Sequence, residues 1–195
     1  MNPADNLVLV GPMGAGKTSI GRRLAERMGL RFVDADREIE AHTGASVATI
    51  FECEGEAGFR GRERALLAQL LDGAGQLVAT GGGAVLAAEN RALLRARGFV
   101  VHLHADVDAQ VARLARDRTR PLLQRPDRDA VLHALAEQRA PLYAEVADLR
   151  YDTSRQSCGD AAASLAQLLA TRWQRATPGD AAPRASDGDD AAGAA

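Results

Sequence analysis

Short apolar runs alternate along the chain with segments of helical periodicity. Residues 6–10 (NLVLV) form an apolar run that ends at a glycine, which is typical of a buried parallel strand. Residues 17–28 then place apolar side chains at helical spacing, and Gly29 ends the pattern. The first two elements are therefore predicted to be a strand and a helix that follows it directly.

The same alternation continues to about residue 175. We expect further strands at residues 31–33, 76–79, 99–103 and 149–151, and helical segments at about 37–72, 88–97, 107–116, 128–146 and 160–175. Five strands separated by helices predict an α/β domain over residues 1–176, with a five-stranded parallel sheet covered by helices on both faces. Such sheets bind ligands at the carboxyl ends of their strands.

Composition excludes several classes of protein. With 46% apolar and 26% charged residues and a formal charge of −2, the chain is typical of a soluble globular protein and gives no electrostatic reason to expect nucleic-acid binding. The two cysteines, Cys53 and Cys158, are too few for a disulfide framework, and no apolar run is long enough to span a membrane. Residues 177–195 lack large apolar side chains, so we expect a disordered tail. We also expect a cytoplasmic protein, because the first residues lack the basic and apolar regions of a signal peptide.

A glycine-rich motif joins the first strand to the first helix. Residues 11–18 read GPMGAGKT and match G-x-x-x-x-G-K-[ST], the phosphate loop. Glycines let backbone amides converge on phosphates, and the helix N-terminus adds partial positive charge. A glycine turn that binds nothing fits this context poorly. The motif predicts a nucleotide site in which Lys17 reaches the β- and γ-phosphates and the Thr18 hydroxyl binds Mg²⁺; the site is formed by Gly14, Ala15, Gly16, Lys17, Thr18 and Ser19.

The phosphate loop alone does not distinguish kinases, GTPases and ATPases. The chain has no N-K-x-D sequence, which a GTPase uses to recognise guanine. Its length, and the position of the first strand at the start of the chain, favour a kinase that acts on a small metabolite or a nucleotide.

Further segments carry candidate residues for the acceptor. They are Val33–Asp36 (VDAD), Phe59–Glu63 (FRGRE), Thr80–Ala84 (TGGGA), and the pair 120–123 (RPLL) and 139–143 (RAPLY). Each segment alone also has a purely structural interpretation: helix N-cap acids, exposed helix arginines, a flexible turn, or a solvated helix charge. Because residues alternate in an extended segment, we expect Asp34 and Asp36 to point to one side.

Taken together, in this order and spacing, these segments and the phosphate loop resemble those of shikimate kinases over about residues 7–155. The resemblance implies a three-layer P-loop NTPase fold with a mobile lid at about residues 116–128. It also implies transfer of the γ-phosphoryl group of ATP to the 3-hydroxyl of shikimate, which gives shikimate 3-phosphate and ADP in chorismate and aromatic amino acid biosynthesis. Mg²⁺ is the implied cofactor, and a monomer is expected.

The resemblance also implies roles for individual residues. Asp34 would hold Mg²⁺ through water, and Asp36 would bind the acceptor hydroxyl and act as its base. Arg60 and Arg139 would bind the carboxylate of shikimate, a task that suits the planar guanidinium, and Glu63 would orient Arg60. The substrate site would also include Gly81, Gly82 and Gly83.

Three arginines are implied to serve the nucleotide. Arg120, in the lid, would contact the transferring phosphoryl group, where its charge stabilises the transition state. Arg113 and Arg155 would touch the nucleotide. The chain departs from many relatives at Gly61, where they have a second arginine, and at Cys158, where they often have proline.

Two rival functions share the phosphate loop. A gluconate-type or nucleoside-monophosphate kinase would not need the whole set of segments, and a non-catalytic nucleotide-binding module would be expected to lose Asp36, Arg60 or Lys17. His102 and His104 alternate along a strand and share a face, which is compatible with a metal site, although no third ligand is evident. Trp173 is predicted to pack in the core.

Overall fold

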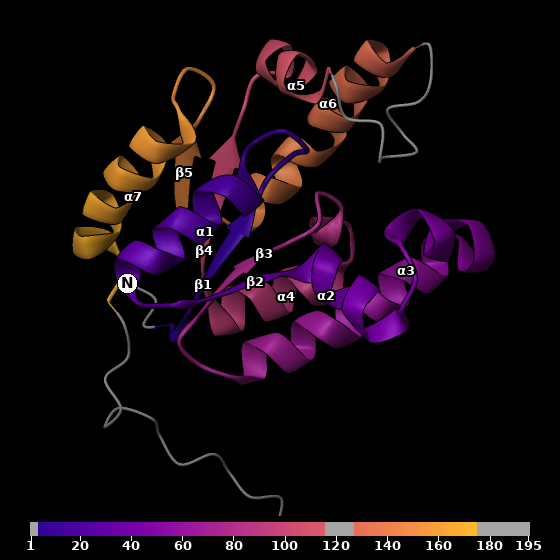
Figure 1. The fold of residues 1–195 in the computed structure, drawn as a ribbon, viewed down its shortest axis with the longest axis horizontal. Helices are drawn as coiled ribbons and strands as arrows, with labels where there is room; N and C mark the ends of the chain where they lie inside the picture. The colour runs from indigo at the N-terminus through magenta and orange to yellow at the C-terminus, as the bar shows by residue number, and fades with distance from the viewer. Residues whose placement is uncertain (1–3, 116–126, 175–195) are drawn as a thin grey trace, which may run out of the picture.

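A computed structural model describes residues 4–115 and 127–174. Its parallel sheet has the order β2-β3-β1-β4-β5 (Figure 1). The strands are β1 (Asn6–Val10), β2 (Arg31–Asp34), β3 (Gln76–Ala79), β4 (Gly98–His104) and β5 (Leu149–Asp152). The central strand β1 pairs with β3 and β4, so that Leu9 lies opposite Ala79 on one side and Val101 on the other. The predicted five-stranded parallel sheet is confirmed.

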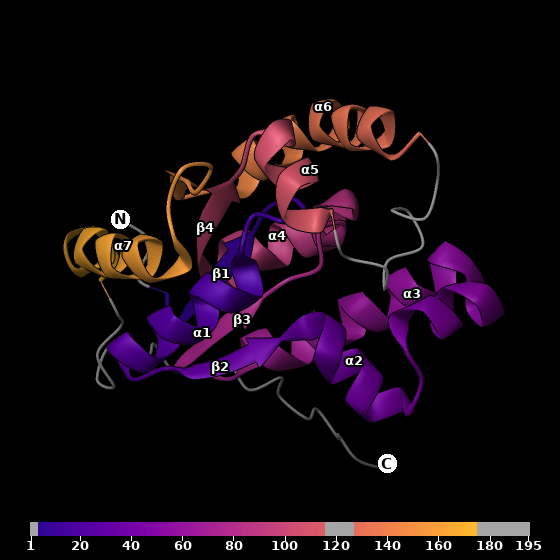
Figure 2. The same ribbon diagram turned by 45° about the horizontal axis from the view of Figure 1, so that its top comes forward.

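Helices cover both faces of the sheet, as predicted (Figures 1 and 2). α1 and α7 pack on one face, and α3, α4 and α6 pack on the other. The helices are α1 (Lys17–Met28), α2 (Ala35–Thr43), α3 (Val47–Asp72), α4 (Ala88–Arg97), α5 (Val107–Leu114), α6 (Arg128–Val146) and α7 (Cys158–Arg172), with a short 3-10 helix, η1 (Ala84–Leu86).

The apolar run of β1 serves two cores. Leu7 and Leu9 pack in the core beneath α1 and α7, whereas Val8 and Val10 pack in the core beneath α3, α4 and α6. Each of these four side chains is 0% exposed, and burying one contributes roughly 1.5–3 kcal/mol. Successive strand residues point to opposite faces, so a strand covered on both faces must be apolar throughout.

Trp173 packs in the core beneath α1 and α7. It is 5% exposed, and its indole N–H donates to the carbonyl oxygen of Ala4 at 2.8 Å. The predicted packing role is confirmed.

Among the described residues, no helix has the length and apolar character needed to cross a membrane.

Two predicted boundaries are wrong in an informative way. β2 extends to Asp34, and α2 begins at Ala35, where an extended segment was expected. Asp34 caps the helix because its side chain accepts the amide of Arg37 at 3.3 Å. Asp36 therefore lies in the first turn of α2, so alternation along an extended strand is not what sets its direction. α7 likewise begins two residues earlier than expected, where Ser157 caps it.

The expected disordered tail (177–195) lies outside the described residues. So does the expected lid, except for residues 127 and 128.

Candidate active site

The phosphate loop has a backbone that only glycine adopts easily. Gly11 and Gly16 have φ angles of 144° and 91°, in the region that side chains rarely occupy. A Cβ at Gly11 would also lie 2.2 Å from the carbonyl oxygen of Leu103. Lys17 folds back over the loop, and its Nζ donates to the carbonyl oxygens of Gly11 and Pro12 at 2.7 and 2.8 Å.

Thr18 and Asp34 meet at the carboxyl end of β2. The Thr18 hydroxyl donates to Asp34 Oδ2 at 2.7 Å, so the two predicted metal residues lie together. Hydroxyl and carboxylate oxygens suit Mg²⁺, which is usually held by one or two protein groups, phosphates and water. Among the described residues no cluster of three His, Cys, Asp or Glu side chains could hold a metal alone. The donor set therefore fits Mg²⁺ carried by a nucleotide.

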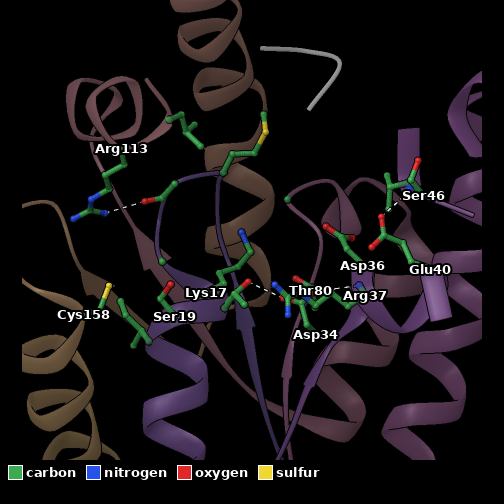
Figure 3. A pocket seen from close by; sticks show the side chains of 18 of the residues that line it. Lys17, Ser19, Asp34, Asp36, Arg37, Glu40, Ser46, Thr80, Arg113 and Cys158 are labelled. Atoms are coloured by element: carbon green, nitrogen blue, oxygen red, sulfur yellow. Dashed lines mark hydrogen bonds between the residues drawn. The ribbon is translucent and has the colours of Figure 1, made fainter. Parts of the chain in front are cut away.

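A cavity of about 1020 Å³ connects the phosphate loop to Asp36. Figure 3 shows Arg113 and Cys158 on one side of Lys17, and Asp36 and Glu40 on the other. The lining includes residues that were predicted to contact the nucleotide, its Mg²⁺ or the acceptor: Gly14, Gly16, Lys17, Thr18, Ser19, Arg113, Asp34, Asp36 and Gly82. Ala15 is fully buried instead, and its carbonyl accepts the Thr153 hydroxyl at 3.0 Å.

The glycine loop, residues 81–83, meets the other predicted acceptor residues. A Cβ on its first glycine would lie 2.7 Å from Glu63 Oε1 and 2.8 Å from Asp36 Oδ1. A Cβ on the second would lie 3.6 Å from an Arg139 nitrogen, and one on the third 2.2 Å from an Arg60 nitrogen. At the first and third glycines a Cβ would be too close to these groups, whereas at the second it would make an ordinary contact. The structure thus gathers two carboxylates and two arginines around the loop.

Arg60 is held by two glutamates of its own helix. It donates to Glu63 Oε2 at 2.7 Å and to Glu56 at 3.2 Å. The predicted contact between Arg60 and Glu63 is therefore present. Burial raises the pKa of the fully buried Glu63, an effect that Arg60 and Arg139 oppose and Asp36 reinforces. Glu63 Oε1 has no hydrogen-bond partner among the described residues.

Sequence reasoning missed a buried aromatic pair beneath the glycine loop. The Tyr143 hydroxyl donates to the Gly82 carbonyl at 2.6 Å, and its ring stacks on His102 at a centroid distance of 4.8 Å. Burial lowers the pKa of His102 to about 4, with smaller contributions from His104, Arg150 and Lys17. The available signal was Tyr143 within the RAPLY segment, one helical turn after Arg139.

His102 and His104 do share a face, with ring centroids 5.9 Å apart. His102 is engaged by Tyr143, and the part of the chain that the structure describes supplies no third metal ligand for the pair.

Arg113 joins the phosphate loop to the loop before α7. Its guanidinium donates to the carbonyl oxygen of Gly14 at 2.9 Å and to the Thr153 hydroxyl at 3.2 Å, and also to the carbonyl oxygens of Thr153 and Ser154. Arg155 is exposed and does not line the cavity, whereas the next three residues, 156–158, do. Arg120 lies outside the described residues.

Comparison with known proteins agrees with this geometry. The family model for shikimate kinase matches residues 13–170. The shikimate kinase of Stenotrophomonas maltophilia (strain K279a) is 63% identical over 175 residues, which cover 90% of this chain and 97% of the relative. That of Xanthomonas campestris pv. campestris (strain 8004) is 58% identical over 174 residues, or 89% of this chain and 97% of the relative.

A solved structure extends the likeness to three dimensions. Shikimate kinase from Acinetobacter baumannii in complex with shikimate has a TM-score of 0.83 and 46% identity, and covers 87% of this chain and 94% of that chain. The family model, the curated relatives and this fold agree over almost the whole described chain, and the chain belongs to the shikimate kinase family.

Proposed function

We propose that this chain transfers the γ-phosphoryl group of ATP to the 3-hydroxyl of shikimate, with Mg²⁺ as cofactor, and forms shikimate 3-phosphate and ADP. The observation that carries the proposal is a cavity that contains both a phosphate loop and Asp36, beside a glycine loop met by two arginines. A nucleotide-binding module would not need the second half of this arrangement.

The phosphate loop binds the nucleotide. Its amides and the α1 N-terminus receive the phosphates, and Lys17 exchanges its two loop carbonyls for phosphate oxygens. Thr18 would hold Mg²⁺ directly, and Asp34 would hold it through water. When bound, Mg²⁺ neutralises charge on the β- and γ-phosphates. Arg113 holds the phosphate loop against the segment before α7. The proposed contact of Arg155 with the nucleotide rests on the resemblance alone.

The acceptor binds between the glycine loop and α2. Arg60 and Arg139, which lie against the glycine loop, form charge-assisted hydrogen bonds with its carboxylate. Asp36 accepts the hydrogen bond of the reacting hydroxyl and takes its proton. Positioning supplies most of the catalysis because phosphoryl transfer needs little covalent help from the protein.

Several further parts of the proposal rest on the resemblance. Arg120 stabilises the transferring phosphoryl group from a lid at residues 116–128. Residues 1–176 form the catalytic domain, and residues 177–195 follow it as a tail. The enzyme acts as a monomer in the cytoplasm, within chorismate biosynthesis.

ADP release by the purified protein with Mg²⁺ and ATP tests the proposal. We compare shikimate, gluconate, AMP and no acceptor in one assay. Release that depends on shikimate alone is the expected result. Folded protein that binds ATP but releases ADP only with gluconate or AMP would leave a phosphate-loop kinase with a different acceptor.

A further inference from the structure

A buried tyrosine lies directly behind the glycine loop. Tyr143, on α6, is 3% exposed, and its hydroxyl donates a 2.6 Å hydrogen bond to the carbonyl oxygen of Gly82. The proposed reaction does not use this hydroxyl as an acid or a base. Burial raises the pKa of Tyr143 to about 12, so the hydroxyl keeps its proton at neutral pH and remains a donor.

This hydrogen bond orients a peptide of the glycine loop. Glycine has a wide choice of backbone angles, so three in succession define no single conformation. A trans peptide points its carbonyl and the next amide in opposite directions. Holding the Gly82 carbonyl on Tyr143 therefore holds the Gly83 amide on the opposite side, and Gly83 is the glycine that packs against Arg60.

Arg139 lies one helical turn before Tyr143 on α6 and close to the same loop. One of its guanidinium nitrogens lies 3.6 Å from the place of a Cβ at Gly82, and its positive charge acts to lower the pKa of the Tyr143 hydroxyl. Arg139 is 9% exposed, and its Nε has no partner among the described residues. Gly82 thus lies against both the Tyr143 hydroxyl and the arginine proposed to bind the acceptor's carboxylate.

The tyrosine ring is fixed from behind by His102, which stacks on it with an angle of 26° between the planes. His102 lies on β4 opposite Val10, the last residue before the phosphate loop. We propose that Tyr143 is a positioning residue that sets the Gly82–Gly83 peptide, against which Arg139 and Arg60 lie, for recognition of the acceptor's carboxylate. This inference rests on the proposed function.

Tyr143→Phe tests the proposal because it keeps the ring on His102 and removes only the hydroxyl. The matched control is Tyr151→Phe, which removes the other tyrosine hydroxyl of the chain; that hydroxyl donates to Gln156 at 2.8 Å on the nucleotide side. We measure KM for shikimate and for ATP, together with kcat. We also measure the ratio of kcat/KM for shikimate to that for its analogue with a hydroxymethyl group in place of the carboxylate. This ratio does not depend on the fraction of folded enzyme.

Tyr143→Phe is expected to raise KM for shikimate about 10-fold, with KM for ATP and kcat within about 2-fold of wild type. Its selectivity for shikimate over the analogue should fall about 10-fold, whereas Tyr151→Phe should retain the wild-type selectivity. Unchanged selectivity in Tyr143→Phe, or an equal loss in both variants, would overturn this inference and leave the proposed function intact. Wild-type protein without shikimate-dependent turnover would instead overturn the proposed function, and this inference with it.

Discussion

The buried histidine beneath the active site makes the stability of the fold depend on pH. His102 is 5% exposed and stacks on Tyr143, and this burial is the main cause that lowers its pKa from 6.5 to about 4. The groups that oppose its protonation are His104 on the same strand, Arg150 on β5, and Lys17 at the phosphate loop. The folded protein therefore keeps His102 neutral at a pH where the unfolded chain protonates it.

The sign and size of the effect follow from proton linkage. A histidine with a lowered pKa in the folded state contributes full stability above pH 6.5, and this contribution is lost as the pH falls from 6.5 towards 4. At about pH 5 the unfolded histidine is almost fully protonated and the folded one mostly neutral, which costs the wild type about 2 kcal/mol relative to about pH 7.5. That is a large share of the typical stability of a domain, about 5–15 kcal/mol.

His102→Phe isolates this contribution because phenylalanine keeps a ring against Tyr143 and cannot bind a proton. Urea unfolding at about pH 7.5 and about pH 5 gives the free energy of unfolding of each protein. Wild type should lose about 2 kcal/mol more than His102→Phe over this interval. His133→Gln, which removes an exposed histidine, should follow wild type. Equal losses in wild type and His102→Phe would refute the argument.

Three further predictions concern the proposed site and the packing of the helices. Asp36→Asn should lower kcat at least about 100-fold, because the amide cannot take the acceptor's proton, while calorimetry finds ATP affinity within about 2-fold of wild type; wild-type turnover would refute the base assignment. Arg60→Lys should raise KM for shikimate about 10-fold, since lysine cannot form the fork, whereas Arg62→Lys, in an exposed pair with Glu54, should not. Gly21→Ala should destabilise the fold by about 1–3 kcal/mol, because its Cβ would lie 2.9 Å from Leu9 and Phe32 side-chain atoms. The Cβ of Gly61→Ala meets nothing within 4 Å, so this variant should stabilise the fold by roughly 0.5–1 kcal/mol. Thermal unfolding that ranks the two variants in the opposite order would contradict this prediction.

The sheet was predictable because its signals are local. β1, β3, α1, α4 and α6 begin and end where the apolar pattern and the glycines indicate. The order of the strands is not local information, because it depends on which strands pair across the whole chain. The alternation of strands and helices could predict a parallel sheet, but not that β3 lies between β2 and β1.

The same distinction between local and long-range information applies to the candidate site. The phosphate loop and the segments around Asp36, Arg60 and the glycine loop were visible as motifs, and the structure brings them together. The RAPLY segment drew attention to Tyr143, but its contact with Gly82 joins residues 61 positions apart, and nothing near either residue in sequence indicates that the two meet. Arg155 is exposed and outside the cavity lining, so its proposed contact with the nucleotide still rests on the motif alone.

Asp34 shows that a structural role and a functional role of one residue need not exclude each other. Its Oδ1 accepts the amide of Arg37 and caps α2, while its Oδ2 accepts the Thr18 hydroxyl at the phosphate loop. The cap fixes the carboxylate at the end of β2, and this fixed position is what brings its second oxygen to Thr18. Because α2 begins at the next residue, the same cap also places Asp36 in the first helical turn, where it lines the cavity. Capping is therefore the local interaction through which the sequence positions both acids of the proposed reaction.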